Sequence, residues 1–180
     1  MQSLRTEIGA EIRAANGELV RRIPFRECHS LLKGFIQMLT VQMAEVHQFI
    51  RDYTGTVKDV RAASDSLGVN ATTQTDQGIV IGSGDTVVTM EDYKLETQIT
   101  TNISHLTVSF AVENPDSDTW RLAVSRGFTN NTGADVDVNE VALYGAMYPY
   151  AYICMDRTLY AVTFSAGETL TMTYRISVSL

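Results

Sequence analysis

One short segment carries several side chains that could bind a metal ion. Glu113, Asn114, Asp116 and Asp118 lie close together, and carboxylate and amide oxygens are the ligands that Ca²⁺ prefers. The EF-hand spacing is absent, because neither a central glycine nor a glutamate twelve positions along completes the loop. The segment therefore predicts a solvated acidic loop, with a calcium site as the alternative.

A glycine pair after an apolar run raises the question of nucleotide binding. Gly82-Ser83-Gly84 follows a strand-like segment, but the dinucleotide fingerprint needs a third glycine and a helix behind it. Val87 stands at the third glycine position, and the Lys-Ser/Thr pair of a phosphate-binding loop is missing. The spacing around Ser83 also differs from that of a hydrolase nucleophile elbow. We expect a hairpin turn here and no cofactor.

Histidines and cysteines are few and widely spaced. Neither Cys28 nor Cys154 has a second cysteine at a zinc-binding spacing, so both are expected to be buried, reduced thiols. The three histidines are His29, His47 and His105, and we expect them to be structural. No catalytic signature appears, and the sequence predicts that the protein is not an enzyme.

Charge and hydropathy narrow the class of protein further. The 180 residues include 14 basic and 21 acidic side chains, a net charge of −7, which argues against general nucleic-acid binding. No stretch approaches the roughly 20 apolar residues of a membrane span. Glu7 and Glu11 stand where a signal peptide needs its apolar core, so we expect synthesis in a cytoplasm.

The first third of the chain shows apolar residues at helical spacing. Leu4, Ile8 and Ile12 predict a short helix that ends at Asn16-Gly17. From Pro24 to Tyr53, spacings of three and four continue as a heptad-like series and predict one long helix. We therefore expect a helical assembly segment over residues 1–64, followed by a polar linker over residues 65–77.

The apolar arc of the long helix is wider than the seam of a two-stranded coiled coil. It would pack either on the chain's own β-domain or on copies of itself and other subunits, and we favour the second arrangement. A polar residue in the middle of the series would then fix register and oligomer state. The predicted interface consists of Phe25, Leu32, Phe35, Ile36, Leu39, Gln42, Met43, Val46, Phe49 and Ile50.

After Gly78 the apolar residues alternate with polar ones, as in half-buried strands. The last segment is the most regular, with Leu170, Met172, Tyr174 and Ile176 on one face. About eight such strands separated by turns predict an antiparallel β-sandwich over residues 78–180, with a jelly roll as one form of it. The predicted fold class is thus α+β, with N-terminal helices followed by this sandwich.

Tyrosines crowd one part of the predicted sandwich. They are Tyr144, Tyr148, Tyr150, Tyr152 and Tyr160. Aromatic rings fill cores, form protein interfaces and stack on sugars. We favour the core, and a protein interface and then a carbohydrate site stay open as alternatives.

Several turn-and-strand segments of the second half resemble small virion structural proteins of tailed bacteriophages. They are residues 78–86 (GIVIGSGDT), 90–95 (MEDYKL), 128–133 (FTNNTG), 138–144 (VNEVALY), 156–159 (DRTL) and 166–170 (AGETL). The resemblance implies an oligomeric building block of the tail, neck or capsid surface, located in the virion and assembled in the host bacterial cytoplasm.

Its implied partners are copies of itself and other virion proteins, without nucleic acid or membrane. The alternative function is a carbohydrate-binding receptor-recognition module of a phage tail, which depends on the tyrosine cluster.

Overall fold

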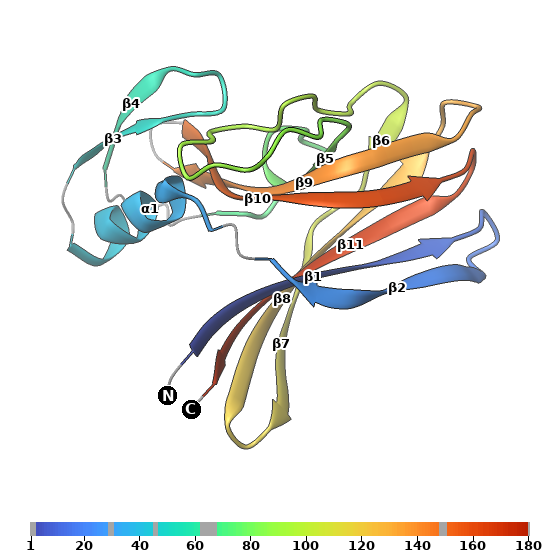
Figure 1. Ribbon diagram of the computed structural model, residues 1–180, viewed down its shortest axis with the longest axis horizontal. Helices are drawn as coiled ribbons and strands as arrows, with labels where there is room; N and C mark the ends of the chain where they lie inside the picture. Colours follow the sequence, from blue (N-terminus) through green and yellow to red (C-terminus); the bar gives the residue numbers. More distant parts are fainter. Residues whose placement is uncertain (1–2, 29–30, 45–46, 62–67, 148–150, 180) are drawn as a thin grey trace. The chain divides into compact units, whose positions relative to one another are not determined.

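The computed structural model describes residues 3–28, 31–44, 47–61, 68–147 and 151–179. Almost all of its regular structure is β-strand (Figure 1). In chain order the elements are β1 (Ser3–Arg13), β2 (Leu19–Glu27), α1 (Lys33–Ala44), β3 (Gln48–Arg51), β4 (Val57–Val60), β5 (Gly78–Gly82), β6 (Ile103–His105), β7 (Ser109–Asp116), β8 (Thr119–Asn130), β9 (Val136–Met147), β10 (Ala151–Phe164) and β11 (Thr169–Ser179). In the described part of the chain, no helix is long and apolar enough to span a membrane.

The chain forms two compact units, each built from separated segments. Unit 1 comprises Met1–His29, Thr100–Asp137 and Thr163–Leu180, and unit 2 comprises Ser30–Ile99 and Val138–Val162. Neither unit is therefore one continuous stretch of the sequence.

Unit 1 contains an antiparallel sheet with the order β2-β1-β11-β8-β6, and β7 also pairs with β8. The first strand lies against the last one, with Ser3 opposite Ser179 and Arg13 opposite Thr169. On the other side, β11 pairs with β8 over its full length. Chain segments from the beginning, middle and end of the sequence thus share one sheet.

The predicted fold class is wrong, because the structure has no long N-terminal helix and is mostly β. Residues 3–13 form a strand, since their even positions are apolar or small while Arg5, Glu7 and Glu11 occupy the odd ones. The spacing of four that links Leu4 to Ile8 fits a strand as well as a helix. The complete alternation distinguishes the two and favours the strand.

The long helix expected over residues 24–53 is also wrong. Pro24 lies inside β2, which is an edge strand with a register shift opposite Ile8 and Ala10, and an edge strand or bulge tolerates proline because its N–H is not needed. The helix that does form in this segment, α1, is 12 residues long. Thr54-Gly55, which directly follows the expected helix, lies in the turn between β3 and β4. There Asp52 Oδ1 accepts hydrogen bonds from the Thr54 and Thr56 amides at 3.0 Å.

Unit 2 combines α1, the β3–β4 hairpin and the antiparallel sheet β10-β9-β5. Its core contains Leu32, Val80, Leu95, Ala142, Tyr144 and Cys154. On α1, Met38 and Val41 are buried while Ile36 is exposed. After β5 the chain continues without a strand until β6, so the hairpin expected at Gly82-Ser83-Gly84 does not form.

Candidate functional site

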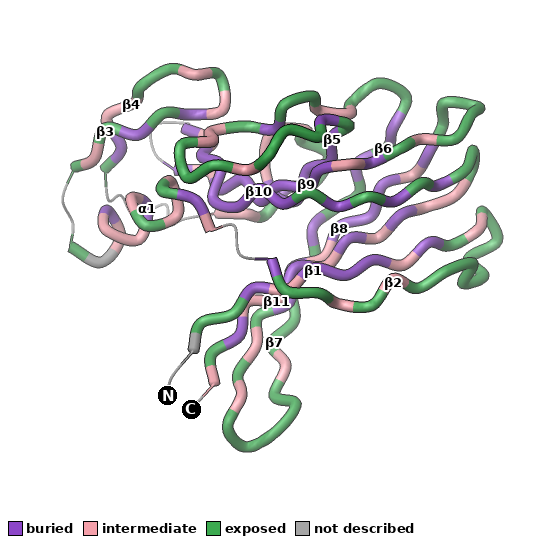
Figure 2. Tube along the Cα trace, in the orientation of Figure 1, coloured by how far each residue is buried: buried purple, intermediate pink, exposed green. Residues whose placement is uncertain are grey.

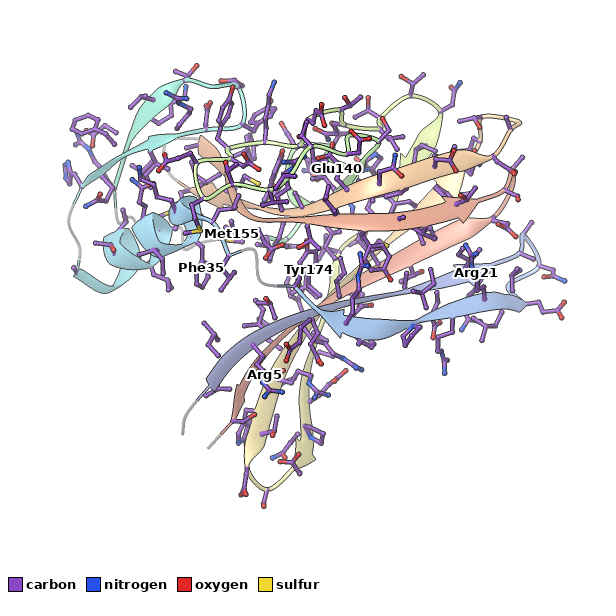
Figure 3. The ribbon with its side chains drawn as sticks, viewed as in Figure 1. Arg5, Arg21, Phe35, Glu140, Met155 and Tyr174 are labelled. Atoms are coloured by element: carbon purple, nitrogen blue, oxygen red, sulfur yellow. The ribbon has the colours of Figure 1, made fainter. Side chains whose placement is uncertain are left out.

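Two opposite charges are buried side by side in unit 2. Glu140 on β9 and Arg157 on β10 are joined at 2.8 Å between Oε2 and Nε, and their side chains are 0% and 3% exposed. Figure 3 shows the Glu140 side chain among the strands and loops of this unit. Charges at this depth need partners, because an uncompensated buried charge is strongly unfavourable.

The carboxylate of Glu140 is also held by the backbone of the long loop after β5. Its Oε1 accepts hydrogen bonds from the amides of Gly84 at 3.1 Å and Thr97 at 2.9 Å. Its Oε2 accepts one from the Glu96 amide at 3.1 Å. One side chain therefore fixes both ends of a loop that has no strand of its own.

The guanidinium of Arg157 ties the middle of the same loop. Nη1 lies 2.7 Å from Asp92 Oδ2, and Nη2 donates to the carbonyl and hydroxyl oxygens of Thr86 at 3.1 and 3.0 Å. Burial lowers the pKa of Arg157, but its bonds to Asp92 and Glu140 outweigh this and raise it. Burial likewise raises the pKa of Asp92, and hydrogen bonds from Thr89 and Arg157 more than offset it, so this pKa lies below its usual value.

These contacts bring together four of the segments that carry the virion-protein resemblance. Thr86, Asp92, Glu140 and Arg157 come from residues 78–86, 90–95, 138–144 and 156–159 respectively. Their charged groups are engaged with one another and with backbone amides. The arrangement therefore holds the loop after β5 in place through side chains that are buried in unit 2.

A small groove lies beside this network. It has a volume of about 230 Å³ and is lined by side chains of both charges, among them Lys33, Arg51 and Glu91. Arg51 lies 5.2 Å from the centre of the Tyr93 ring, and Lys33 Nζ lies 3.1 Å from Glu91 Oε2. Glu91 and Asp92 also line the groove, which therefore carries charges of both signs.

A different kind of surface lies in unit 1, at one end of its sheet. Register partners in neighbouring strands point to the same face. Ile8, Tyr174 and Val124 form one such row and are buried. Of these three, Tyr174 is labelled in Figure 3. Large apolar side chains continue the same face toward the strand ends but are exposed: Leu4, Phe110, Val112, Trp120, Leu122 and Val178. We refer to these six side chains as the apolar sheet end.

The register makes the apolar sheet end continuous over four strands. Leu4 lies beside Val178, which lies beside Trp120. In the next row, Ile176 lies beside Leu122, and Leu122 lies beside Val112. Figure 2 shows the exposed residues at the start of β1 and along β7, and in Figure 1 these strand ends lie where both chain termini are marked.

On β1, β11, β8 and β7, the rows of the apolar sheet end contain no charged side chain. Arg26 on β2 lies beside Ile8, in the same row as Phe110. Charges of those four strands, such as Arg5, Arg121 and Arg175, are at odd positions and project from the opposite face. There Glu113 Oε2 lies 3.5 Å from Arg121 Nη1 and 3.3 Å from Arg175 Nε. The opposite face also holds a groove of about 590 Å³ floored mainly by small and hydroxyl side chains.

The structure does not gather the predicted interface residues on one helix face. Phe25 lies on β2, and Leu32 precedes α1 and is fully buried in the unit 2 core. Phe35, Ile36, Leu39, Gln42 and Met43 lie on α1, and Phe49 and Ile50 lie on β3. Val46 lies outside the described residues. Phe49 is 72% exposed and its neighbour Ile50 is buried, because they alternate on a strand.

The other candidate residues have structural surroundings. Glu113 engages arginines, and Asp116 Oδ1 accepts a hydrogen bond from the Asp118 amide at 3.0 Å. In the described ranges, no group of three or more histidine, cysteine or acidic residues is arranged to hold a metal ion. His105 is buried with its ring edge-on to Phe128, and His47 Nδ1 lies 3.4 Å from Asp59 Oδ1. His29 lies outside the described residues.

Of the tyrosine cluster, Tyr144 and Tyr160 are buried and Tyr152 is half-buried. The Tyr144 hydroxyl accepts a hydrogen bond from the Leu95 amide at 2.7 Å. Tyr148 and Tyr150 lie outside the described residues. The buried rings belong to the core of unit 2.

Comparison with protein-family models, curated proteins and solved structures finds no match.

Sequence reasoning missed both the ionic network and the exposed position of the apolar sheet end. Glu140 directly precedes the apolar run of residues 141–144 in β9, and Arg157 lies within the largely apolar β10. Opposite charges in such surroundings are a signal for a buried pair. The alternation of Trp120, Leu122 and Val124 identifies the apolar face correctly. It does not distinguish a covered row from an exposed one.

Proposed function

We propose that this chain is a non-enzymatic structural protein of a bacteriophage virion, an oligomeric building block of the tail, neck or capsid surface. The observation that carries the proposal is the apolar sheet end. Trp120 is 60% exposed and Val112 is 71% exposed, and their rows carry no charged side chain on β1, β11, β8 and β7. Contiguous apolar surface of this kind is typical of a protein–protein interaction site.

The ionic network of unit 2 gives the proposal secondary support. The segments that resemble virion proteins order a loop around Glu140 and Arg157. A network whose charged groups are already paired supports a structural role better than a catalytic one.

The test is the composition of purified particles. Phage particles from a lysate that carries this sequence should be purified on a density gradient and digested for mass spectrometry. Peptides of this chain should be present at a constant ratio to the other structural proteins. Separating tails from capsids before digestion then assigns the chain to one of the two.

Absence of the chain from particles in which other structural proteins are detected would contradict the proposal. A matched soluble fraction of the same lysate serves as the control. There, the chain should be depleted when assembly is complete.

A further inference from the structure

We infer that the apolar sheet end is covered by the same end of a second copy of this chain, packed face to face. The inference deepens the proposed function, because it assigns the first assembly contact to particular strands. The contact consists of β1, β11, β8 and β7 of one copy against the same strands of the other.

The absence of charge on this surface restricts what can cover it. Leu4, Val178 and Trp120 form the outermost row, and on β1, β11, β8 and β7 no charged side chain lies in this row or in the next two. The nearest charge in these rows is Arg26 on β2, beside Ile8 in the third row. A charged partner surface would lose its hydration here without gaining a counter-charge. The occupant must therefore present an apolar face of its own.

The shape of the surface points to another sheet. Four adjacent strands at ~4.8 Å spacing give a surface roughly 15 Å wide, and sheets cover one another face to face at a separation of about 10 Å. The apolar sheet end of a second copy has the required width and character. A two-fold axis would place each copy's surface on its equivalent.

The exposed apolar area supplies a large part of what a stable pair needs. The six side chains expose on the order of 500 Å² of apolar surface. A standard interface buries roughly 800 Å² per partner, so polar residues around the six side chains have to supply the remainder of the contact. Trp120, which is the only tryptophan in the chain, lies in this surface and is the type of residue that dominates binding energy.

The test uses the full chain and two matched valine variants. Val112 is 71% exposed in the apolar sheet end, and Val87 is 81% exposed in unit 2. The wild-type protein should sediment as a two-chain species that dissociates on dilution. Val112→Lys should weaken association by about tenfold or more, whereas Val87→Lys should leave it unchanged.

Trp120 supplies a second readout that does not depend on any variant. Its fluorescence emission should shift to longer wavelength as the wild-type protein is diluted, since the indole ring returns to water. Leu4→Lys, at the other side of the surface, should reproduce the effect of Val112→Lys if that variant fails to fold.

A wild-type protein that sediments as a monomer at all concentrations would overturn the inference. So would an oligomer that survives both Val112→Lys and Leu4→Lys, or dilution without a shift in Trp120 emission. These results are separable from the composition of particles. A monomeric chain that is nevertheless present in virions refutes the pairing only, and a pair that is absent from virions refutes the proposed function only.

Discussion

Arg157 and Glu140 face each other on neighbouring strands, with Nε 2.8 Å from Oε2 and both side chains almost fully buried. Through this pair, side-chain contacts hold the loop between β5 and β6, in addition to the backbone hydrogen bonds from Ser83 to Thr97 and from Ile99 to Ile81. Substitutions in the network should therefore reveal how much the loop contributes to stability.

Removing one partner of the pair should be strongly destabilising. Arg157→Met should lower the free energy of unfolding by about 3–5 kcal/mol, because the Glu140 carboxylate would stay buried without its cation. Urea denaturation measures the change. Lys33→Met is the control: it removes an exposed ion pair with Glu91, which should be worth less than about 1 kcal/mol. Equal effects of the two variants would contradict this account of the network.

The close approach of the loop to Glu140 should make Gly84 intolerant of a side chain. A Cβ atom at this position would lie 2.5 Å from the Cβ of Glu96 and 2.6 Å from Glu140 Oε1. We expect Gly84→Ala to destabilise the protein by about 1–3 kcal/mol, measured by thermal denaturation. Ser83→Ala, at the exposed neighbouring position, should have little effect. Full stability of Gly84→Ala would mean that the loop does not lie against Glu140.

Acid should weaken unit 2 through Asp92. Because its pKa is lowered in the folded protein, the ionised carboxylate stabilises the fold at pH values above its unfolded pKa of about 3.9. This contribution is lost as the pH falls through the lower, folded pKa. Urea denaturation between pH 2 and pH 7 should show a smaller loss of stability toward acid for Asp92→Asn than for the wild type. Parallel pH profiles would exclude Asp92 as a contributor.

Both cysteines should resist modification in the native protein. Cys28 and Cys154 are buried and not joined in a disulfide, and burial raises the pKa of the Cys154 thiol well above its usual value. The nucleophile is the thiolate, so a maleimide should label both residues in denaturant and neither one rapidly in buffer. Mass spectrometry counts the added groups. Rapid labelling of the native protein would show that its core opens easily.

The sequence predicted the apolar face of the C-terminal strands but misassigned the N-terminal ones. The pairs Leu4–Ile8 and Ile8–Ile12 are four apart, a distance that is both about one helical turn and two strand repeats. The charged residues between them, Arg5, Glu7 and Glu11, resolve the ambiguity only when the alternation is read as a whole. Once residues 3–13 are taken as a helix, the following segment is easily read in the same way.

The candidate site was harder to predict, because it depends on which elements become neighbours. The predicted interface assumed that Phe25, Leu32 and Phe49 share one helix, whereas the structure distributes them over a strand, the unit 2 core and a hairpin. Trp120 and Val178 lie far apart in the sequence and become register partners only in the sheet. No periodicity within a single segment contains that information.

The pairing of β1 with β11 has a consequence for how the protein is made. Residues 3–13 are synthesised well before their partners at 169–179, so the sheet of unit 1 cannot close until the later segment has left the ribosome. Contacts of such long sequence separation form slowly, because the loop between them must be closed first. In the meantime β1 and β2 expose unpaired strand edges, which other chains can capture. A nascent chain held apart from its neighbours until β11 emerges should therefore give more correctly folded protein than one produced at high density.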